Sequence, residues 1–210
     1  LALRGAAAGA APAEIIDQRN EAYRQELEQH FRTYLVDQYP GRAAGTWRRS
    51  YTGLDAFVRS VEPNRERYRA VFNPPAFEPT GPLERKPHAA APGTEWITVP
   101  LGSLKAEALL AFPDDRSKPA PLVIAQHGIG SFPERVFGID DPTNLYHDYG
   151  HALVKQGFAV LAPFNLASVE KRNRIERLAR LADTTLPGIE LARVQVLLDE
   201  VLQDKRIAPG

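Results

Sequence analysis

The 210-residue sequence contains no cysteine and no methionine, and its 26 basic and 26 acidic side chains give a formal net charge of zero. Without cysteine the chain has no disulfide, no thiolate zinc site, no iron–sulfur cluster and no cysteine nucleophile. The balanced charge argues against nucleic acid as a partner, because proteins that bind it usually carry a basic excess. The length suits one domain of ordinary size, with or without a small appendage.

Long apolar runs and nucleotide-binding fingerprints are missing as well. No run of roughly 18 apolar residues occurs, so we expect no membrane span. Neither G-x-G-x-x-G after a strand nor G-x-x-x-x-G-K-[ST] is present, which argues against nicotinamide and nucleoside-triphosphate chemistry. We therefore expect no cofactor. A hydrophobic content of 43% is normal for a globular protein with a core.

The first 72 residues divide into a small-residue terminus and a helical part. Residues 1–13 are rich in Ala and Gly, and are either a disordered or weakly helical tail or a signal-peptide remnant. The second interpretation favours a periplasmic or secreted protein over a cytoplasmic one. Residues 14–72 carry apolar side chains at helical spacing and are predicted to form an N-terminal helical extension.

Prolines are expected to divide this extension into separate helices. Pro40 is predicted to end the first helix. A second helix is predicted from Thr52, and Pro63 is expected to interrupt it and open a third. Residues 73–93 contain six prolines, so we expect an extended linker there.

Residues 94–210 have the pattern of an α/β fold. A hairpin is predicted from strands at residues 95–99 and 105–112, and two strands buried on both faces at residues 122–126 and 158–162. A helix from Asp141 to Gln156 is expected to connect the buried strands in a parallel βαβ unit. Two more helices are predicted, at residues 171–182 and 186–204.

The loop after the first buried strand, residues 126–130, reads QHGIG and is the strongest candidate site. Open α/β sheets bind ligands at the carboxyl ends of their strands, and glycines there expose backbone amides. Converging amides stabilise the oxyanion of acyl transfer. The alternative is a glycine turn in which His127 only hydrogen-bonds the backbone.

The passage from Pro121 to Pro163 resembles the α/β-hydrolase superfamily, and most closely its acetyl xylan esterase and dienelactone hydrolase-like branch. In that family a buried strand ends in His-Gly, and the next strand lies in a motif that has Gly-Phe near its start and Leu-Ala-Pro near its end. Gly157-Phe158 and residues 161–163 match this motif. Residues 60–69 resemble the N-terminal extension of some bacterial members. The resemblance implies the first half of an α/β-hydrolase domain: an antiparallel hairpin and then a parallel βαβ unit, preceded by helices.

The resemblance also implies roles for the loop residues. The backbone N–H of Ile129 takes the position of an oxyanion-hole donor, with Gly130 as the alternative donor. His127 and Gly128 shape the loop. The family's nucleophile lies in G-x-S-x-G, which occurs nowhere here, and Ser131 is expected to be a loop hydroxyl. The resemblance therefore places the Ser, the acid and the His of the triad beyond Gly210 or on a companion chain.

The predicted function is a serine hydrolase acting on ester bonds of a small molecule or carbohydrate, with a C-terminal half of the same domain as its partner. One alternative is a truncated, non-catalytic binding or assembly fragment. A weaker one is a metal-dependent hydrolase using His147 and His151, spaced four residues apart on a predicted helix. A solvated histidine pair is the simpler interpretation, and no metal site is assigned.

The arginines of residues 171–180 either hold an anionic substrate or solvate a helix. Trp47 and Trp96 either line a carbohydrate platform or are buried anchors.

Overall fold

The computed structural model of the chain describes residues 12–209. Its contacts separate two compact units, the first ending at Tyr68 and the second beginning at Arg69. Of the Ala-rich terminus predicted for residues 1–13, all but the last two residues lie outside the described part. No helix in that part is both long enough and apolar enough to cross a membrane.

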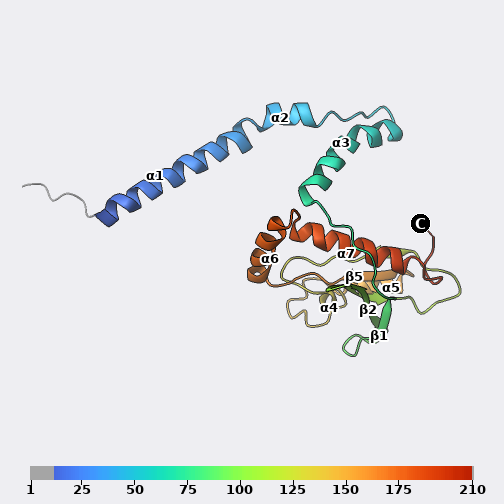
Figure 1. The fold of residues 1–210 in the computed structure, drawn as a ribbon. Coiled ribbons are helices and arrows are strands. Elements are labelled where there is room, and N and C mark those ends of the chain that lie inside the picture. The colour runs from blue at the N-terminus through green and yellow to red at the C-terminus, as the bar shows by residue number, and fades with distance from the viewer. Residues whose placement is uncertain (1–11, 210) are drawn as a thin grey trace, which may run out of the picture. The chain divides into compact units, whose positions relative to one another are not determined.

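The first unit is built from helices (Figure 1). Its elements are α1 (Pro12–Arg32), the π-helical turn η1 (Thr33–Asp37), α2 (Tyr39–Thr46) and most of α3 (Leu54–Phe72). The first helical stretch ends before Pro40, as predicted, but a new helix begins at once, because Pro40 lies in the first turn of α2, where its missing N–H is not needed. The expected break at Pro63 is wrong. Pro63 lies inside the continuous α3, and it removes a single intrahelical hydrogen bond there.

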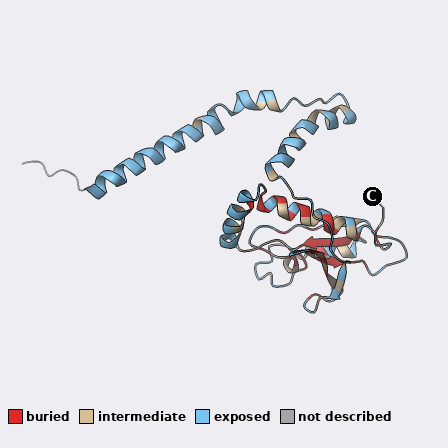
Figure 2. Ribbon diagram, viewed as in Figure 1, coloured by how far each residue is buried: buried red, intermediate tan, exposed pale blue. Residues whose placement is uncertain are grey.

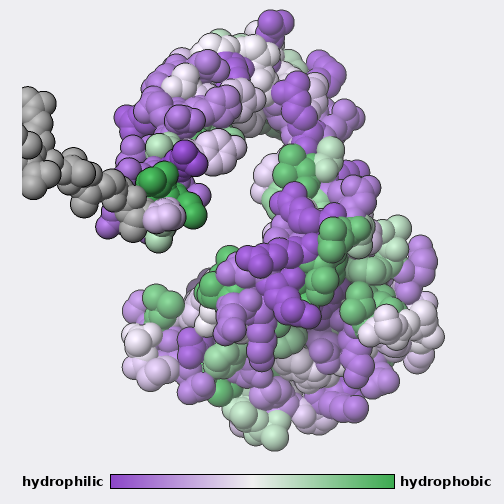
Figure 3. All heavy atoms as spheres, turned by 60° about the vertical axis from the view of Figure 1, so that its left-hand side comes forward, coloured by the Kyte–Doolittle hydropathy of each residue, from purple (hydrophilic) through white to green (hydrophobic). Residues whose placement is uncertain are grey.

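These helices keep their side chains in contact with solvent. No residue from 12 to 68 is buried (Figure 2). The apolar positions predicted from helical spacing are present as an exposed stripe, with Tyr23 62% and Phe31 54% exposed. Figure 3 shows apolar side chains scattered among polar ones on the surface. The spacing of apolar residues therefore predicts these helices correctly, but the helices bury none of their side chains.

The second unit contains a five-stranded sheet. Its spatial order is β1 (Glu84–Pro87), β2 (Thr94–Leu101), β3 (Leu104–Ala111), β5 (Ala159–Pro163) and β4 (Leu122–Ile124). The first three neighbouring pairs are antiparallel, and β4 and β5 are parallel. The predicted hairpin followed by a parallel βαβ unit is confirmed, and the chain has a mixed α/β fold.

Alternating residues of the central strands enter two separate cores. On one face Leu110 of β3 and Leu161 of β5 pack with Leu197 of the helix α7 (Leu186–Val201). On the other face their neighbours Leu109 and Val160 pack with α4 (Pro133–Val136) and with α5 (Tyr149–Lys155). Residues two apart on a strand share a face, so this alternation places helices on both sides of the sheet. Figure 2 shows the buried residues gathered in the strands and along α7.

Two strand predictions need correction. The linker at residues 73–93 contains the short strand β1, which pairs with β2 at the sheet edge, a position that tolerates proline. Strand β4 is not buried on both faces: Ile124 is 43% exposed. Within the described residues β4 pairs along its length with β5 alone, so it lies at the other edge of the sheet.

The long helix predicted from Asp141 to Gln156 is wrong in its first half. The helix α5 begins at Tyr149, after a loop in which Asn144, His147 and Asp148 have positive φ angles. Three such residues cannot continue a right-handed helix. The C-terminal end is as predicted, since Gly157 follows α5 with a φ of +93°. Helix α6 (Val169–Leu181) and α7 match the last two predicted helices in position.

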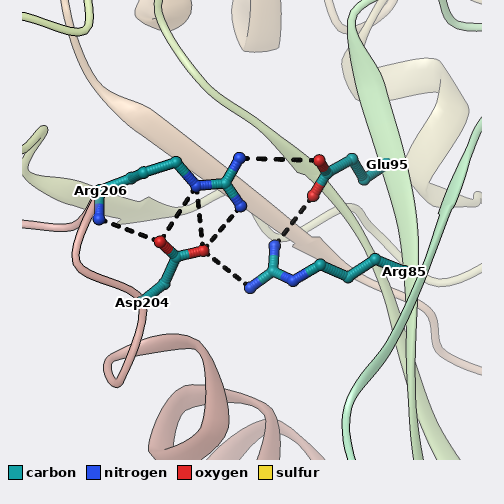
Figure 4. A network of polar contacts seen from close by, with 4 residues as sticks. All are labelled: Arg85, Glu95, Asp204 and Arg206. Carbon is teal, nitrogen blue, oxygen red and sulfur yellow. Dashed lines mark hydrogen bonds and ion pairs between the residues drawn. The ribbon is translucent and has the colours of Figure 1, made fainter.

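A four-residue ionic network joins the sheet edge to the segment after α7 (Figure 4). Arg85 bridges Glu95 and Asp204, each at 2.9 Å, and Arg206 donates to Asp204 at 2.7 Å. The Arg206 side chain holds the pKa of Asp204 down at about 2. The network fixes the turn that leads to Ile207.

Ile207 forms an isolated parallel bridge with Ala120, directly before β4. The Ala120 N–H donates to the Arg206 carbonyl and the Ala208 N–H donates to the Ala120 carbonyl, both at 2.8 Å. The backbone at residues 206–208 is therefore aligned parallel to β4, on the side of β4 away from β5.

Candidate functional site

The QHGIG loop follows β4 at its carboxyl end, and its histidine points into the protein. His127 is 5% exposed, and its Nδ1 lies 3.0 Å from the Gly128 carbonyl oxygen. A carbonyl oxygen only accepts, so Nδ1 is the donor of this hydrogen bond. Nε2 is buried and has no partner among the described residues. This placement, with Nε2 buried, supports a loop-shaping role for His127.

The backbone amides of this loop fall into two classes. The Gly128 N–H donates to the Tyr146 hydroxyl at 2.8 Å, and the Ser131 N–H donates to the Gly128 carbonyl at 3.2 Å. The N–H groups of Gln126, His127, Ile129 and Gly130 make no hydrogen bond within residues 12–209. Gly130 has a φ of +84°, which only glycine adopts without strain. The loop thus has unpaired donors on both sides of Gly128, and Ile129 and Gly130 are the pair that the resemblance assigns to the oxyanion.

A small pocket of about 100 Å³ is lined by residues 126–129 of this loop, and Gly130 is not part of its lining. It lies between the loop after β4 and the loop after β5, which contributes Asn165 and Leu166. Arg172 of α6 and Glu190 of α7 complete its lining. Because β4 and β5 are parallel neighbours, their carboxyl ends meet at the same sheet edge. The pocket is therefore at the position where α/β sheets bind ligands.

The Arg172–Glu190 pair fixes the second loop. Arg172 donates to both carboxylate oxygens of Glu190, at 2.5 and 2.8 Å, and to the Leu166 carbonyl at 2.9 Å. Glu190 also accepts from the Leu166 N–H at 3.3 Å. The hydrogen bonds to Glu190 raise the pKa of Arg172. This guanidinium is neutralised by its partner, so the wall of the pocket carries no unpaired charge from the pair.

The other arginines of residues 171–180 lie away from the pocket. Arg174 and Arg177 are exposed on α6, and Arg180 pairs with Glu176 at 2.8 Å. They solvate the helix, as one of the two interpretations of this run expects.

The histidine pair proposed as a metal site does not share a helical face. His147 lies in the left-handed loop before α5, while His151 is within α5 and contacts Asp148 at 2.6 Å. Across residues 12–209 no three His, Cys, Asp or Glu side chains gather as metal ligands. The metal-dependent alternative required both histidines on one face of a helix, and the structure does not place them so.

Serine positions give no nucleophile–base pair in this part of the chain. Ser131 is 3% exposed, and its hydroxyl is buried without a partner among the described residues. Ser168 caps α6 by accepting from the Lys171 N–H. No serine hydroxyl is hydrogen-bonded to a histidine anywhere between residues 12 and 209.

The tryptophans are placed differently from each other. Trp47 is 46% exposed, so the expectation of a buried anchor is wrong there. Trp96 is half-buried in β2, and its Nε1 donates to Glu107 at 3.3 Å. Neither residue lines the pocket beside the loop.

Four residues at the site were not identified from the sequence: Tyr146, Asn165, Leu166 and Glu190. Tyr146 and Gly128 are 18 residues apart, as are Arg172 and Glu190, and no local pattern indicates contacts over such separations. Asn165 and Leu166 could have been found by a general rule, because they directly follow a buried parallel strand.

Comparison with known proteins supports the fold. No family model and no curated protein sequence matches the chain. Among solved structures, one similar fold is a Bacteroides fragilis protein described as a candidate acetyl xylan esterase, with a TM-score of 0.54 and 18% sequence identity. The match covers 73% of this chain and 45% of that structure. At this identity the similarity shows a hydrolase-like α/β fold, and the chain spans less than half the length of that protein.

Proposed function

We propose that this chain supplies the oxyanion loop of a serine hydrolase acting on ester bonds. The observation that carries the proposal is the unpaired amide of Ile129, a residue that lines a pocket at the carboxyl end of β4, with the unpaired amide of Gly130 next to it in the loop. A developing oxyanion needs fixed donors of this kind, because donors already in place require no reorganisation during the reaction. The similarity of the fold to a candidate acetyl xylan esterase supports the same class of substrate.

In the proposed reaction a serine hydroxyl outside this chain attacks the ester carbonyl, and a histidine takes its proton. The carbonyl oxygen becomes an oxyanion that accepts hydrogen bonds from the Ile129 N–H, with Gly130 as the alternative donor. Collapse of the intermediate releases the alcohol, which receives the proton from the histidine, and water then hydrolyses the acyl-enzyme. His127 and Gly128 keep the loop in shape throughout.

One side of β4 pairs with no strand among the described residues, which indicates how a nucleophile carried on a further strand would reach the loop. Residues 206–208 are already aligned parallel to β4 through their bonds to Ala120. A strand continuing in that direction would pair with β4 and end beside the QHGIG loop. A nucleophile at the end of such a strand would face the unpaired amides, as the strand–turn–helix position of G-x-S-x-G requires.

A fluorophosphonate probe tests the proposal on the native protein, together with any segment that accompanies this chain. We expect one serine to be labelled, and peptide mass spectrometry should place it in a G-x-S-x-G segment outside these 210 residues. The absence of label on every polypeptide in the sample would contradict a serine hydrolase.

The alternative of a non-catalytic fragment is favoured by one observation, the lack of any serine–histidine hydrogen bond in residues 12–209. Intact mass spectrometry of the same sample separates the two proposals. A labelled longer chain or a labelled companion supports the hydrolase. A single unlabelled species of 23.2 kDa supports the fragment.

A further inference from the structure

Two tyrosines hold the first and the middle residue of the QHGIG loop with hydrogen bonds of opposite direction. The Tyr146 hydroxyl accepts from the Gly128 N–H at 2.8 Å. The Tyr149 hydroxyl donates to the Gln126 carbonyl at 3.2 Å. Burial, with Tyr146 close by, raises the pKa of Tyr149, so its phenol keeps the proton that it donates. The two rings lie 6.3 Å apart and form one support for the loop.

Tyr146 is itself fixed by the loop before α5. Its N–H donates to the Asp141 carboxylate at 2.8 Å, and this bond lowers the pKa of Asp141. Its carbonyl accepts from the Tyr149 N–H at 3.1 Å. In the same loop Asn144, His147 and Asp148 all adopt left-handed backbone angles. Backbone in this region persists only where its surroundings enforce it, and such residues are concentrated at functional sites.

The contact between Tyr146 and the loop is close. A Cβ on Gly128 would lie 3.3 Å from the Tyr146 hydroxyl, closer than most side-chain contacts. Glycine at this position therefore lets the backbone approach the phenol. The bond occupies the Gly128 amide, and the next two amides, of Ile129 and Gly130, are unpaired among residues 12–209.

We propose that Tyr146 is the positioning residue of the oxyanion loop: by anchoring the Gly128 amide, it sets the direction of the Ile129 and Gly130 donors. This inference rests on the proposed serine hydrolase function. Tyr146 acts through the backbone and touches no reacting atom. Removing its hydroxyl leaves the fold in place and loosens the donors, so the loss falls on the transition state, in kcat, and leaves KM nearly unchanged.

The test compares Tyr146→Phe with Tyr51→Phe in the native protein. Tyr51 is 77% exposed, and its hydroxyl has no hydrogen bond among residues 12–209, so it is a matched phenol without the proposed role. Hydrolysis of p-nitrophenyl acetate gives kcat and KM, and amide NMR of the Gly128 N–H gives a readout that does not need activity. For Y146F we expect kcat to fall about tenfold, as for loss of one hydrogen bond, with an upfield Gly128 proton that exchanges faster. Y51F should match wild type.

The outcomes separate this inference from the function on which it rests. If wild type takes the fluorophosphonate label and a folded Y146F has the same kcat as wild type, the positioning role alone is overturned. An unchanged Gly128 proton in Y146F also overturns it. If wild type neither takes the label nor hydrolyses the ester, the proposed function is overturned. The catalytic role of the Tyr146–Gly128 hydrogen bond is then overturned with it, although NMR still measures the bond itself.

Discussion

The helices of residues 12–68 and the sheet unit from Arg69 onward use apolar residues in different ways. Both carry them at regular spacing, yet no residue of the first region is buried, whereas every residue of β5 and five of the eight residues of β3 are buried. The helical region is held by local backbone bonds and by pairs such as Arg24–Glu21 at 2.6 Å. Periodicity therefore identifies an element, and a partner surface is what turns an apolar stripe into a core.

The largest effect should follow from removing one amide of the sheet unit. Ile129→Pro deletes the N–H donor, while Ile129→Ala keeps it, and both replace a side chain that is 73% exposed. We expect I129P to lower kcat of the native protein by about 10²–10³, the usual loss for one oxyanion donor. I129A should stay close to wild type in ester hydrolysis. Equal activity of the two variants would contradict the role of this amide.

A pair of leucine truncations sharpens the contrast in burial. Leu161 in β5 is fully buried, and Leu27 in α1 is 40% exposed. Leu161→Ala should lower the free energy of unfolding by about 3 kcal/mol, because it removes packed atoms and leaves a cavity. Leu27→Ala should change it by less than about 0.5 kcal/mol. Urea denaturation measures both, and a large loss for L27A would show that α1 has a partner surface.

Two carboxylates with the same lowered pKa should differ in what they stabilise. Arg206 lowers the pKa of Asp204 to about 2, and Arg24 lowers that of Glu21 to about 2. Asp204 is largely enclosed and ties the segment after α7 to the sheet, so Asp204→Asn should cost about 2 kcal/mol at pH 7. Glu21 is fully exposed, and Glu21→Gln should leave the unfolding of the sheet unit unchanged.

The sign of the pH dependence follows from the lowered pKa of Asp204. The stabilisation is fully present above the unfolded-state pKa near 4 and is lost as pH falls through the folded-state value of about 2. Wild type should therefore lose stability between about pH 4 and pH 2 more steeply than D204N. Parallel acid-denaturation curves for the two proteins would show that the network in Figure 4 contributes little.

The sheet could be predicted from the sequence because its signals are local. Strand β5 is predicted by the apolar run at residues 159–162. Strands β2 and β3 and their antiparallel directions are predicted by the hairpin pattern on either side of Gly102. The carboxyl end of β4 then located the QHGIG loop. The edge position of β4 was missed, since burial of a three-residue strand depends on which neighbours it has.

The rest of the site depends on contacts between distant residues. Asp, Asn and His at positions 140–148 carry no pattern that separates a left-handed loop from a helix, so the helix was extended over them. The Tyr146–Gly128 and Arg172–Glu190 contacts exist only once the elements have packed. The free state of the Ile129 amide is likewise a property of the folded loop.

The most direct test of the central claim is amide NMR of the native protein before and after reaction with a fluorophosphonate. The phosphoryl oxygen of the adduct occupies the place of the oxyanion, so the Ile129 N–H, or that of Gly130, should shift strongly downfield as it gains a hydrogen bond. Gly102, in the β2–β3 turn, should not move. A labelled protein in which neither the Ile129 nor the Gly130 amide changes would contradict the assignment of this loop.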